Sequence, residues 1–297
     1  MVLRGDISTD IVDDWKANNP QYLSKKRLDT MWSYFYCFNF NPTYDASYKP
    51  EDWLKAVNNE NFRHSIMSAF DRAYAIRAFE PDDPESILQN TITPETFCSD
   101  GTTDFSREPA LADNEAKDLF FNADKALEYK KAAMEELSAQ GVTFPVVADY
   151  YIQGSSQTAL DTANVLKQLF TDCLGDDFVT LNIKTYISSV AKEVRSPQLA
   201  SFYINGWGAD YGDPQNYLGQ ETYGMDNAYY SEAYSITRNI TDEKLIAVYE
   251  EFTNMVNAAN AIVGDMDARY EAYADAEKYM IEHALVIPWY KNVLWQV

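Results

Sequence analysis

Short, strongly apolar runs alternate along this chain with longer segments whose apolar residues recur at helical spacing. The run 31–40 (MWSYFYCFNF) is apolar on both faces, which is the pattern of a strand buried on both sides. In contrast, the segment 157–173 places its apolar residues three and four apart, as an amphipathic helix does. Strands that alternate with helices predict an α/β fold, with a mixed, largely internal sheet flanked by helices. We expect strands at 31–40, 142–152, 178–186, 199–205, 285–289 and 293–297, and helices within 51–79, 123–137, 157–173, 188–196, 245–256 and 266–280.

The composition supports a folded, acidic protein. Of 297 residues, 46% are hydrophobic and 14% aromatic, which is enough apolar material for a core. The net charge of -22 argues against nucleic acid and anionic membranes as partners, because phosphate groups would be repelled. Residues 80–118 carry four prolines and many acids without a clean period, so we expect a long ordered loop with short helical pieces. No stretch reaches the roughly 18 to 20 apolar residues of a membrane span, and the first six residues do not resemble a signal peptide.

The cysteines and histidines give no pattern of a metal or catalytic centre. Cys37, Cys98 and Cys173 are odd in number and lack a CxxC spacing, so neither a disulfide framework nor a zinc site is indicated. His64 and His283 lie far apart and outside any HExxH motif, which argues against a histidine metal site and a Ser-His-Asp triad. We therefore expect no metal and no cofactor.

One segment, 201–219 (SFYINGWGADYGDPQNYLG), concentrates the unusual features of the chain. The predicted strand ends in Gly206, Trp207 and Gly208, where we expect backbone groups that nothing bulky shields, beside an indole wall. A ligand backbone could add to such a strand edge. Asp210 follows at the carboxyl end of the strand, where ligands of α/β sheets bind. A lone carboxylate there suits an ammonium group, because charge-assisted hydrogen bonds are short and strong once desolvated.

A plain structural explanation of the same segment stays open on residue types alone. Its acids would then cap a helix that begins near Pro214, after the Asp213-Pro214 turn. Trp207 would in that case be an ordinary core residue.

The segment GWGADYGDPQNYL resembles the solute-binding proteins of oligopeptide and dipeptide ABC importers, the bacterial family 5 type. In that family a Gly-Trp-x-x-Asp-Tyr-x-x-Pro segment closes one wall of the peptide site. It is preceded here by ALDTANVLKQLF, VTLNIKTY and SFYING, in the family's helix and strand order. Two further stretches are similar to family motifs: MWSYFYCFNFN followed by FRHSIMSAFDRAYAI, and RYEAYADAEKYMIEHALVIPWYKN near the end. The three pieces occur in the family's order and cover the chain from about residue 30 onward.

The resemblance implies a fold of two lobes around a cleft, of which this chain holds mainly the second. The fold class is then a periplasmic-binding-protein-like (type II) lobe. We expect residues 1–33 to be a remnant of the first lobe leading to the hinge, 34–288 the second, ligand-binding lobe, and 289–297 the return crossing. A full member carries an amino-terminal lobe and a lipoprotein signal, so we expect this chain, which lacks a signal, to be a fragment. Its complete parent is expected at the extracellular face of the membrane, lipid-anchored, or in the periplasm.

The resemblance also implies roles for matched residues. Asp210 matches the acid that pairs with the peptide's α-ammonium, and Tyr211 supports the same wall. The main chain of Gly206, Trp207 and Gly208 matches the strand that bonds the peptide backbone. Matches to the hinge beside the cleft are Tyr36, Cys37 and Asn39. Cys37 departs from the family, which often carries a polar or acidic residue there.

The implied function is capture of an extended oligopeptide without chemistry, so we expect a binding protein and not an enzyme. The partners would be a membrane permease and its ATPase subunits; we expect a monomer that binds no nucleic acid. Roomy, hydrated pockets would make side-chain selectivity weak. Three alternatives stay open: the same fold with another cargo such as a sugar or nickel complex, a peptide pheromone receptor or adhesin, and a glycoside hydrolase. The last needs two acids about 5 to 9.5 Å apart, for which Asp210 and Asp213 are candidates.

Overall fold

The computed structural model describes residues 6–7, 11–43, 49–81, 83–111, 118–223 and 240–297. Its strands are β1 (Asp6–Ile7), β2 (Leu28–Phe38), β3 (Val146–Gln153), β4 (Val179–Tyr186), β5 (Phe202–Gly208) and β6 (Val286–Gln296). Its α-helices are α1 (Val12–Asn18), α2 (Pro50–Asn58), α3 (Glu60–Ala69), α4 (Arg72–Ile76), α5 (Ala123–Ala139), α6 (Gln157–Leu174), α7 (Gln215–Leu218), α9 (Glu243–Ala261) and α10 (Met266–Glu282).

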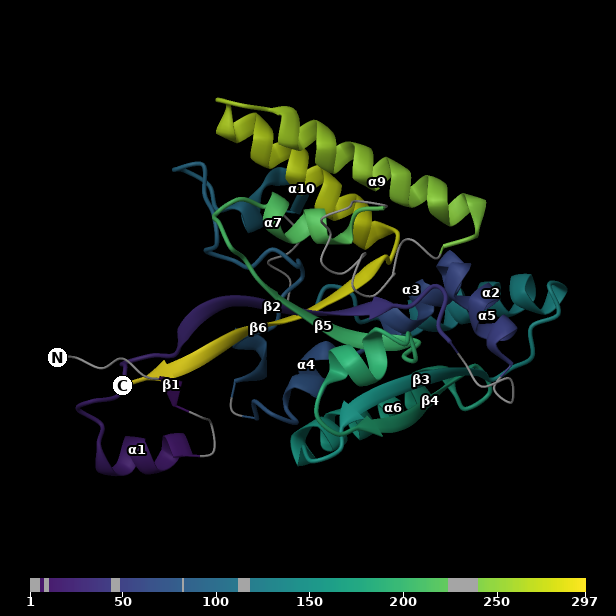
Figure 1. Ribbon diagram of the computed structural model, residues 1–297, viewed down its shortest axis with the longest axis horizontal. Coiled ribbons are helices and arrows are strands. Elements are labelled where there is room, and N and C mark those ends of the chain that lie inside the picture. The colour runs from purple at the N-terminus through teal and green to yellow at the C-terminus, as the bar shows by residue number, and fades with distance from the viewer. Residues whose placement is uncertain (1–5, 8–10, 44–48, 82, 112–117, 224–239) are drawn as a thin grey trace.

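Two sheets organise the chain (Figure 1). The larger has the order β1-β6-β2-β5 with antiparallel neighbours throughout, and β2 at its centre pairs with both β5 and β6. The smaller is the parallel pair β3-β4, with α6 as the crossover between its strands. The outer ends of β2 and β6 run together toward α1 and the C-terminus, away from the other helices (Figure 1).

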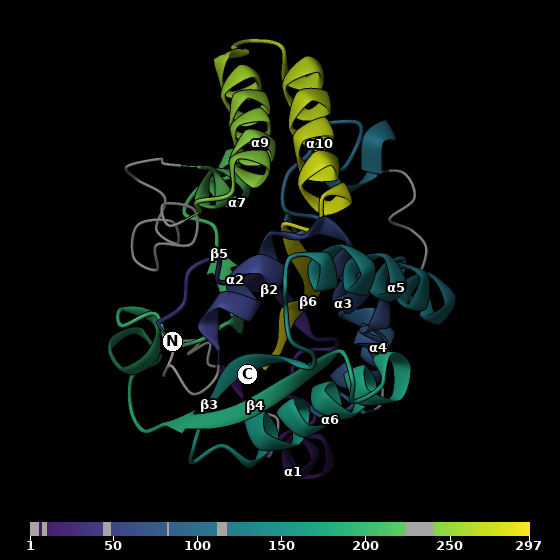
Figure 2. The same ribbon diagram turned by 90° about the vertical axis from the view of Figure 1, so that its right-hand side faces the viewer.

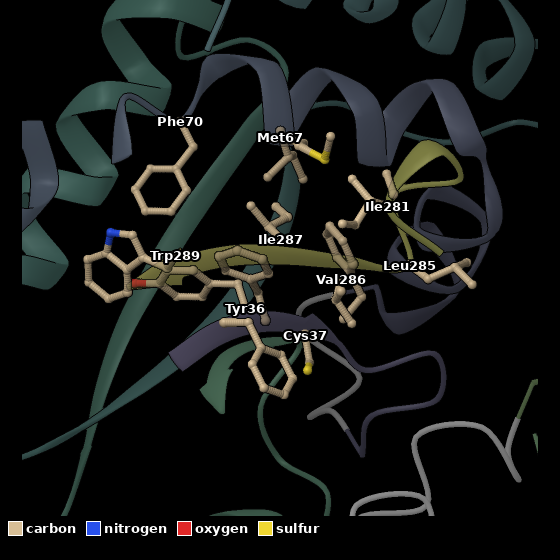
Figure 3. Packing of buried hydrophobic residues seen from close by; sticks show 14 of the residues in the cluster. Tyr36, Cys37, Met67, Phe70, Ile281, Leu285, Val286, Ile287 and Trp289 are labelled. Carbon is tan, nitrogen blue, oxygen red and sulfur yellow. The ribbon is translucent and has the colours of Figure 1, made fainter. Parts of the chain in front are cut away.

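The core forms where α3 and α6 cover the centre of the larger sheet. The ring of Tyr36 on β2 stacks on Phe202 of β5, with centroids 4.7 Å apart, and meets Trp289 of β6 at 5.1 Å. Phe70, at the C-terminal end of α3, contacts both Tyr36 and Trp289 (Figure 3). Burying aromatic side chains of this size dominates core stability. The apolar-on-both-faces pattern of 31–40 therefore predicted the central strand correctly.

The long loop before α5 is ordered by buried charges, as expected for 80–118, of which 82 and 112–117 lie outside the described residues. Arg72 is fully buried, and its guanidinium donates to the carbonyls of Gln89 and Pro288 and to the carboxylate of Asp118. From α10, the carboxylate of Glu277 accepts the backbone N–H groups of Ile92 and Thr93. The loop holds the short 3-10 turns Pro84–Ser86 and Phe105–Arg107.

Local signals explain where the elements differ from expectation. The predicted helical stretch 51–79 divides into three helices, because Asn59 and Asp71 each accept a backbone N–H and start a new helix. The two expected C-terminal strands are one continuous strand, β6. The expected helix 188–196 is a single π-type turn, Ala191–Arg195.

The two last helices form a hairpin. α9 and α10 lie side by side and stand above α7 at one end of the molecule (Figure 2). Among the described residues, no helix combines the length and the apolar character that crossing a bilayer demands.

Candidate functional site

The candidate residues from Gly206 to Tyr211 lie at the carboxyl end of β5, the outer strand of the larger sheet. The start of this strand adjoins the smaller sheet, since the Ser201 N–H donates to the carbonyl of Asp149 at 2.9 Å. The opposite end leads into the loop before α7. In the register with β2, Gly206 lies opposite Tyr34 and Gly208 opposite Trp32.

Aromatic rings from β2 lie across both glycines of the motif. A Cβ at position 206 would stand 2.7 Å from Cε1 of Tyr34, and one at 208 would stand 2.6 Å from Nε1 of Trp32. The expectation that nothing bulky shields these glycines is therefore wrong for this face of the sheet. The physical reason is that large rings on one strand fill the space that glycines leave on the next.

These rings belong to a row that two neighbouring strands, β2 and β6, supply. Trp32 and Tyr34 lie with centroids 6.5 Å apart, and Tyr34 stacks on Tyr290 of β6 at 4.6 Å with an interplanar angle of 12°. Each member is only partly buried or exposed. The larger sheet thus presents a flat aromatic surface on the side where Gly206 and Gly208 lie.

The loop after β5 is held from inside by Asn216. Its Oδ1 accepts both the indole Nε1–H of Trp207 and the backbone N–H of Asp210, each at 2.9 Å. Asn216 lies on α7 and is buried. One amide oxygen therefore fixes the indole and the start of the loop relative to the same helix.

The second acid of the loop is engaged in an ion pair. Asp213 accepts two hydrogen bonds from Arg269, and its Oδ1 also accepts the Gln215 N–H at the start of α7. The bonds to Asp213 hold the pKa of the Arg269 guanidinium above its usual value. The prediction that acids of this loop cap a helix near Pro214 is confirmed for Asp213.

Asp210 and Tyr211 face solvent. Both residues are exposed, and 53% of Tyr211 is accessible. The Tyr211 hydroxyl donates to the side-chain carbonyl of Gln215. The Asp210 carboxylate thus stands on an anchored loop, accessible to a cationic group, while its neighbour Asp213 is neutralised.

The three hinge candidates lie in the core and are withdrawn as ligand contacts. Tyr36, Cys37 and Asn39 are 0%, 1% and 4% exposed. The Tyr36 hydroxyl lies 3.2 Å from that of Tyr150, and Asn39 Nδ2 donates to the carbonyl of Ala200. Burial raises the pKa of the Cys37 thiol well above its usual value. The half of β2 from Phe35 to Phe38 is buried on both faces, so the side chains of Tyr36 and Cys37 are packed in the core.

Four residues around the site were missed by sequence reasoning: Trp32, Tyr34, Asn216 and Tyr290. Trp32 and Tyr34 both lie within the predicted aromatic strand 31–40, but only the register with β5 shows that their rings cover the glycines. Asn216 lies inside the matched motif, six residues after Asp210, and its polar side chain near a turn is the one signal that pointed to it.

Both histidines of the chain contact one carboxylate. His283 Nδ1 lies 3.0 Å and His64 Nε2 3.6 Å from different oxygens of Glu60. The two imidazoles, that of His64 first, lower the pKa of Glu60 to about 2. The described part of the chain contains no group of three or more His, Cys, Asp and Glu side chains placed to hold a metal ion.

Comparison with known proteins places these features in a wider group. Residues 3–228 match the family model described as "Bacterial extracellular solute-binding proteins, family 5 Middle". The oligopeptide-binding protein AliB of Streptococcus pneumoniae is 28% identical over 282 residues, which cover 86% of this chain and 43% of AliB. This chain therefore spans less than half the length of that relative.

Solved structures show the same fold. The peptide-bound OppA of Listeria monocytogenes superposes with a TM-score of 0.67 at 19% identity, over 99% of this chain and 49% of that one. The pheromone receptor PrgZ, whose structure describes its mode of peptide binding, superposes with a TM-score of 0.66 at 16% identity, over 99% of this chain and 48% of that one.

Proposed function

Because this chain belongs to the bacterial extracellular solute-binding proteins of family 5, we propose that it forms the second lobe of the peptide-capturing component of an ABC importer. The α/β fold is that of periplasmic-binding-protein-like peptide-binding proteins, as the sequence predicted. In this proposal the complete protein captures an extended oligopeptide between two lobes and delivers it to a membrane permease driven by ATPase subunits.

The proposed division of the chain rests on β2 and β6, which in this proposal cross between the two lobes. β2 and β6 pair from Leu28 with Leu294 to Cys37 with Val286, and their outer ends run beyond the helices together (Figure 1). In the proposal, residues 1–33 lead from the first lobe into the hinge, 34–288 form the second lobe, and 289–297 return. Rotation about such a pair of strands closes the lobes over a ligand.

The observation that carries the proposal is the contrast between the two acids of the loop after β5. Asp213 is neutralised by Arg269, whereas Asp210 is exposed on the same loop, which Asn216 and Arg269 fix from two sides. A carboxylate carried by an anchored backbone needs less ordering when an ammonium group arrives, which favours the charge-assisted hydrogen bond. We assign Asp210 to the α-ammonium of the peptide, with Gly206, Trp207 and Gly208 along the peptide backbone and Tyr211 beside them.

The proposed activity is binding without catalysis. A glycoside hydrolase would need Asp210 and Asp213 as an acid and base pair, but two hydrogen bonds from Arg269 occupy the Asp213 carboxylate. We also propose a monomer at the extracellular face of the membrane or in the periplasm, in line with the family's description as extracellular.

A pheromone-binding role is the second candidate, favoured by the structural likeness to PrgZ. It uses the same peptide site and differs in the purpose of capture.

A panel of cargoes tests the proposed function. The complete protein that contains this chain would be titrated calorimetrically with a hydrophobic pentapeptide, a disaccharide and a nickel chelate. We expect the peptide alone to bind. Asp210→Ala should weaken peptide binding roughly 30-fold or more, since removing one partner of a desolvated charge pair costs about 2 to 5 kcal/mol. Asp275→Ala, an exposed acid on α10, is the matched control and should leave affinity unchanged. Binding of sugar or nickel without peptide would overturn the proposal.

A further inference from the structure

A groove of about 380 Å³ opens beside β5, next to the candidate site. We call it the aromatic groove, after the side chains that dominate its lining. They come from the segment just after α4, from the two strands of the smaller sheet, and from β5 and β6: Phe79, Tyr151, Tyr186, Ile204, Trp289 and Tyr290. Its volume lies at the lower end of the range of roughly 300 to 1,000 Å³ typical of ligand pockets.

The aromatic groove is uncharged in a strongly acidic protein. The chain has 46 Asp and Glu residues, yet no residue lining the groove in the described part of the chain is Asp, Glu, Lys or Arg. Burial raises the pKa of Tyr186 and of Tyr290, so these phenols stay neutral. A charged group that entered the groove would lose water without gaining an opposite charge.

The groove is also preformed. Its floor includes Trp289, which is 2% exposed and whose indole N–H donates to the Arg72 carbonyl at 3.3 Å. Tyr290 lies between the rings of Tyr34 and Phe79, at 4.6 and 4.9 Å. Side chains locked in this way need no rearrangement to receive a ligand group, which favours binding.

The groove and the candidate peptide site form one continuous surface. Ile204 lines the groove and lies two residues before Gly206 on β5. Tyr290 lines the groove as well, and it stacks on Tyr34, whose ring covers Gly206. From Ile204 to Asp210 are six residues, roughly 20 Å of extended chain. A peptide anchored at Asp210 by its first residue that follows β5 therefore reaches the groove with roughly its seventh residue.

We propose that the aromatic groove receives one bulky, uncharged side chain of the bound peptide, aromatic or branched aliphatic, and so makes this protein selective at that position. This inference rests on the proposed function and goes against the weak selectivity expected from the sequence. Apolar side chains gain by leaving water for such a surface, and rings stack favourably on its aromatic walls.

The test is a guest-residue scan with the complete protein. Octapeptides of alanine carry one guest, Trp, Leu, Ala, Lys or Glu, at each position in turn, and affinity is measured by calorimetry. We expect one position near the seventh where Trp and Leu bind at least tenfold tighter than Ala, and Lys and Glu bind no better than Ala. If all guest residues bound alike at every position, the proposed selectivity of the groove would be overturned while the proposed function would stand. No binding of any peptide would overturn both.

Two variants tie the preference to the groove. Ala159→Trp, which fills the groove from α6, should abolish the preference for Trp and Leu guests while the all-alanine peptide binds as before. Gln153→Lys, at the exposed rim, keeps the fold undisturbed and should favour the Glu guest over Trp. Gln168→Lys makes the same charge change on α6, outside the groove lining, and is the matched control. Asp210→Ala should weaken all peptides without changing their ranking. A ranking that Ala159→Trp and Gln153→Lys both leave unchanged would overturn the inference.

Discussion

The guanidinium of Arg269 holds the carboxylate of Asp213 through two hydrogen bonds, 2.8 Å from Nε to Oδ2 and 3.0 Å from Nη2 to Oδ1. The same guanidinium donates to the carbonyls of Ala259, Asn260 and Ile262 at the end of α9. One side chain of α10 therefore joins the helical hairpin to the loop that carries Asp210. The stability of the hairpin and the shape of the candidate site are linked through this pair.

Replacing Arg269 should cost stability. Arg269→Ala removes the cation that pairs with the Asp213 carboxylate and the donor to three backbone carbonyls, so we expect a loss of about 2 to 4 kcal/mol in the free energy of unfolding. Urea denaturation measures it. Lys278→Ala, on the same helix, removes an exposed pair with Glu282 and should cost less than about 0.5 kcal/mol. Equal effects of the two changes would contradict the role assigned to Arg269.

A methyl group at position 206 should also destabilise the protein. Gly206→Ala drives a Cβ into the ring of Tyr34, which cannot swing aside because it stacks on Tyr290. We expect a loss of about 1 to 3 kcal/mol, the usual cost of overpacking. Gly212→Ala is the control, since nothing lies within 4 Å of its added Cβ. A Gly206→Ala protein as stable as the wild type in thermal denaturation would show that the rings do not lie across the strand.

The sequence predicted the individual helices and strands better than it predicted which of them lie next to one another. The segment 157–173 predicted α6 almost residue for residue, because one apolar face at helical spacing needs no tertiary information. The strand expected at 199–205, running into Gly206, Trp207 and Gly208, is β5, which begins at Phe202 and pairs with β2 as far as Gly208. Rings from β2 cover its two glycines. Which strand supplies such rings depends on register, and register is a property of the folded sheet.

The residues of the candidate site were likewise predicted only in part. The motif around Asp210 located the exposed carboxylate, since a charged residue after an apolar strand marks its carboxyl end. The hinge candidates Tyr36 and Cys37 lie in the half of β2 that is buried on both faces, which the resemblance did not indicate. That Asp213 and not Asp210 is paired follows from Arg269, 56 residues away in sequence, which no local pattern reveals.

Stability should fall with rising pH because of Glu221. This residue is 3% exposed, one carboxylate oxygen lacks a hydrogen bond, and burial raises its pKa to about 8. In the unfolded chain the pKa is about 4.3. The folded form then keeps the proton over a range where the unfolded form loses it. The stability this proton gives is complete below about pH 4 and is lost as pH rises toward 8, by up to about 1.4 kcal/mol per pH unit.

Comparison with Glu221→Gln isolates this effect. The difference in the free energy of unfolding between the variant and the wild type, from urea curves at pH 5 and pH 8, should shift in favour of the variant at the higher pH. Comparing the two proteins cancels other titrating groups, including Glu277, whose pKa burial raises to about 7. A difference that is constant across this range would show that Glu221 ionises normally.

Asn216 should act on the candidate site without touching a ligand. Asn216→Ala removes the acceptor of both the Trp207 indole and the Asp210 N–H, so we expect faster hydrogen exchange at Asp210 and a loss of about 1 to 3 kcal/mol in stability. Exchange measured by NMR checks this. Unchanged protection at Asp210 would mean that the loop is held elsewhere.

The central claim is that the Asp210 carboxylate binds the ammonium group of a peptide. The most direct measurement is calorimetric titration of the complete protein and its Asp210→Ala variant with a pentapeptide and its N-acetylated twin. We predict that acetylation weakens binding to the wild type roughly 30-fold or more, and that the variant binds both peptides with the same low affinity. A variant that still prefers the free amino terminus as strongly as the wild type would contradict the claim.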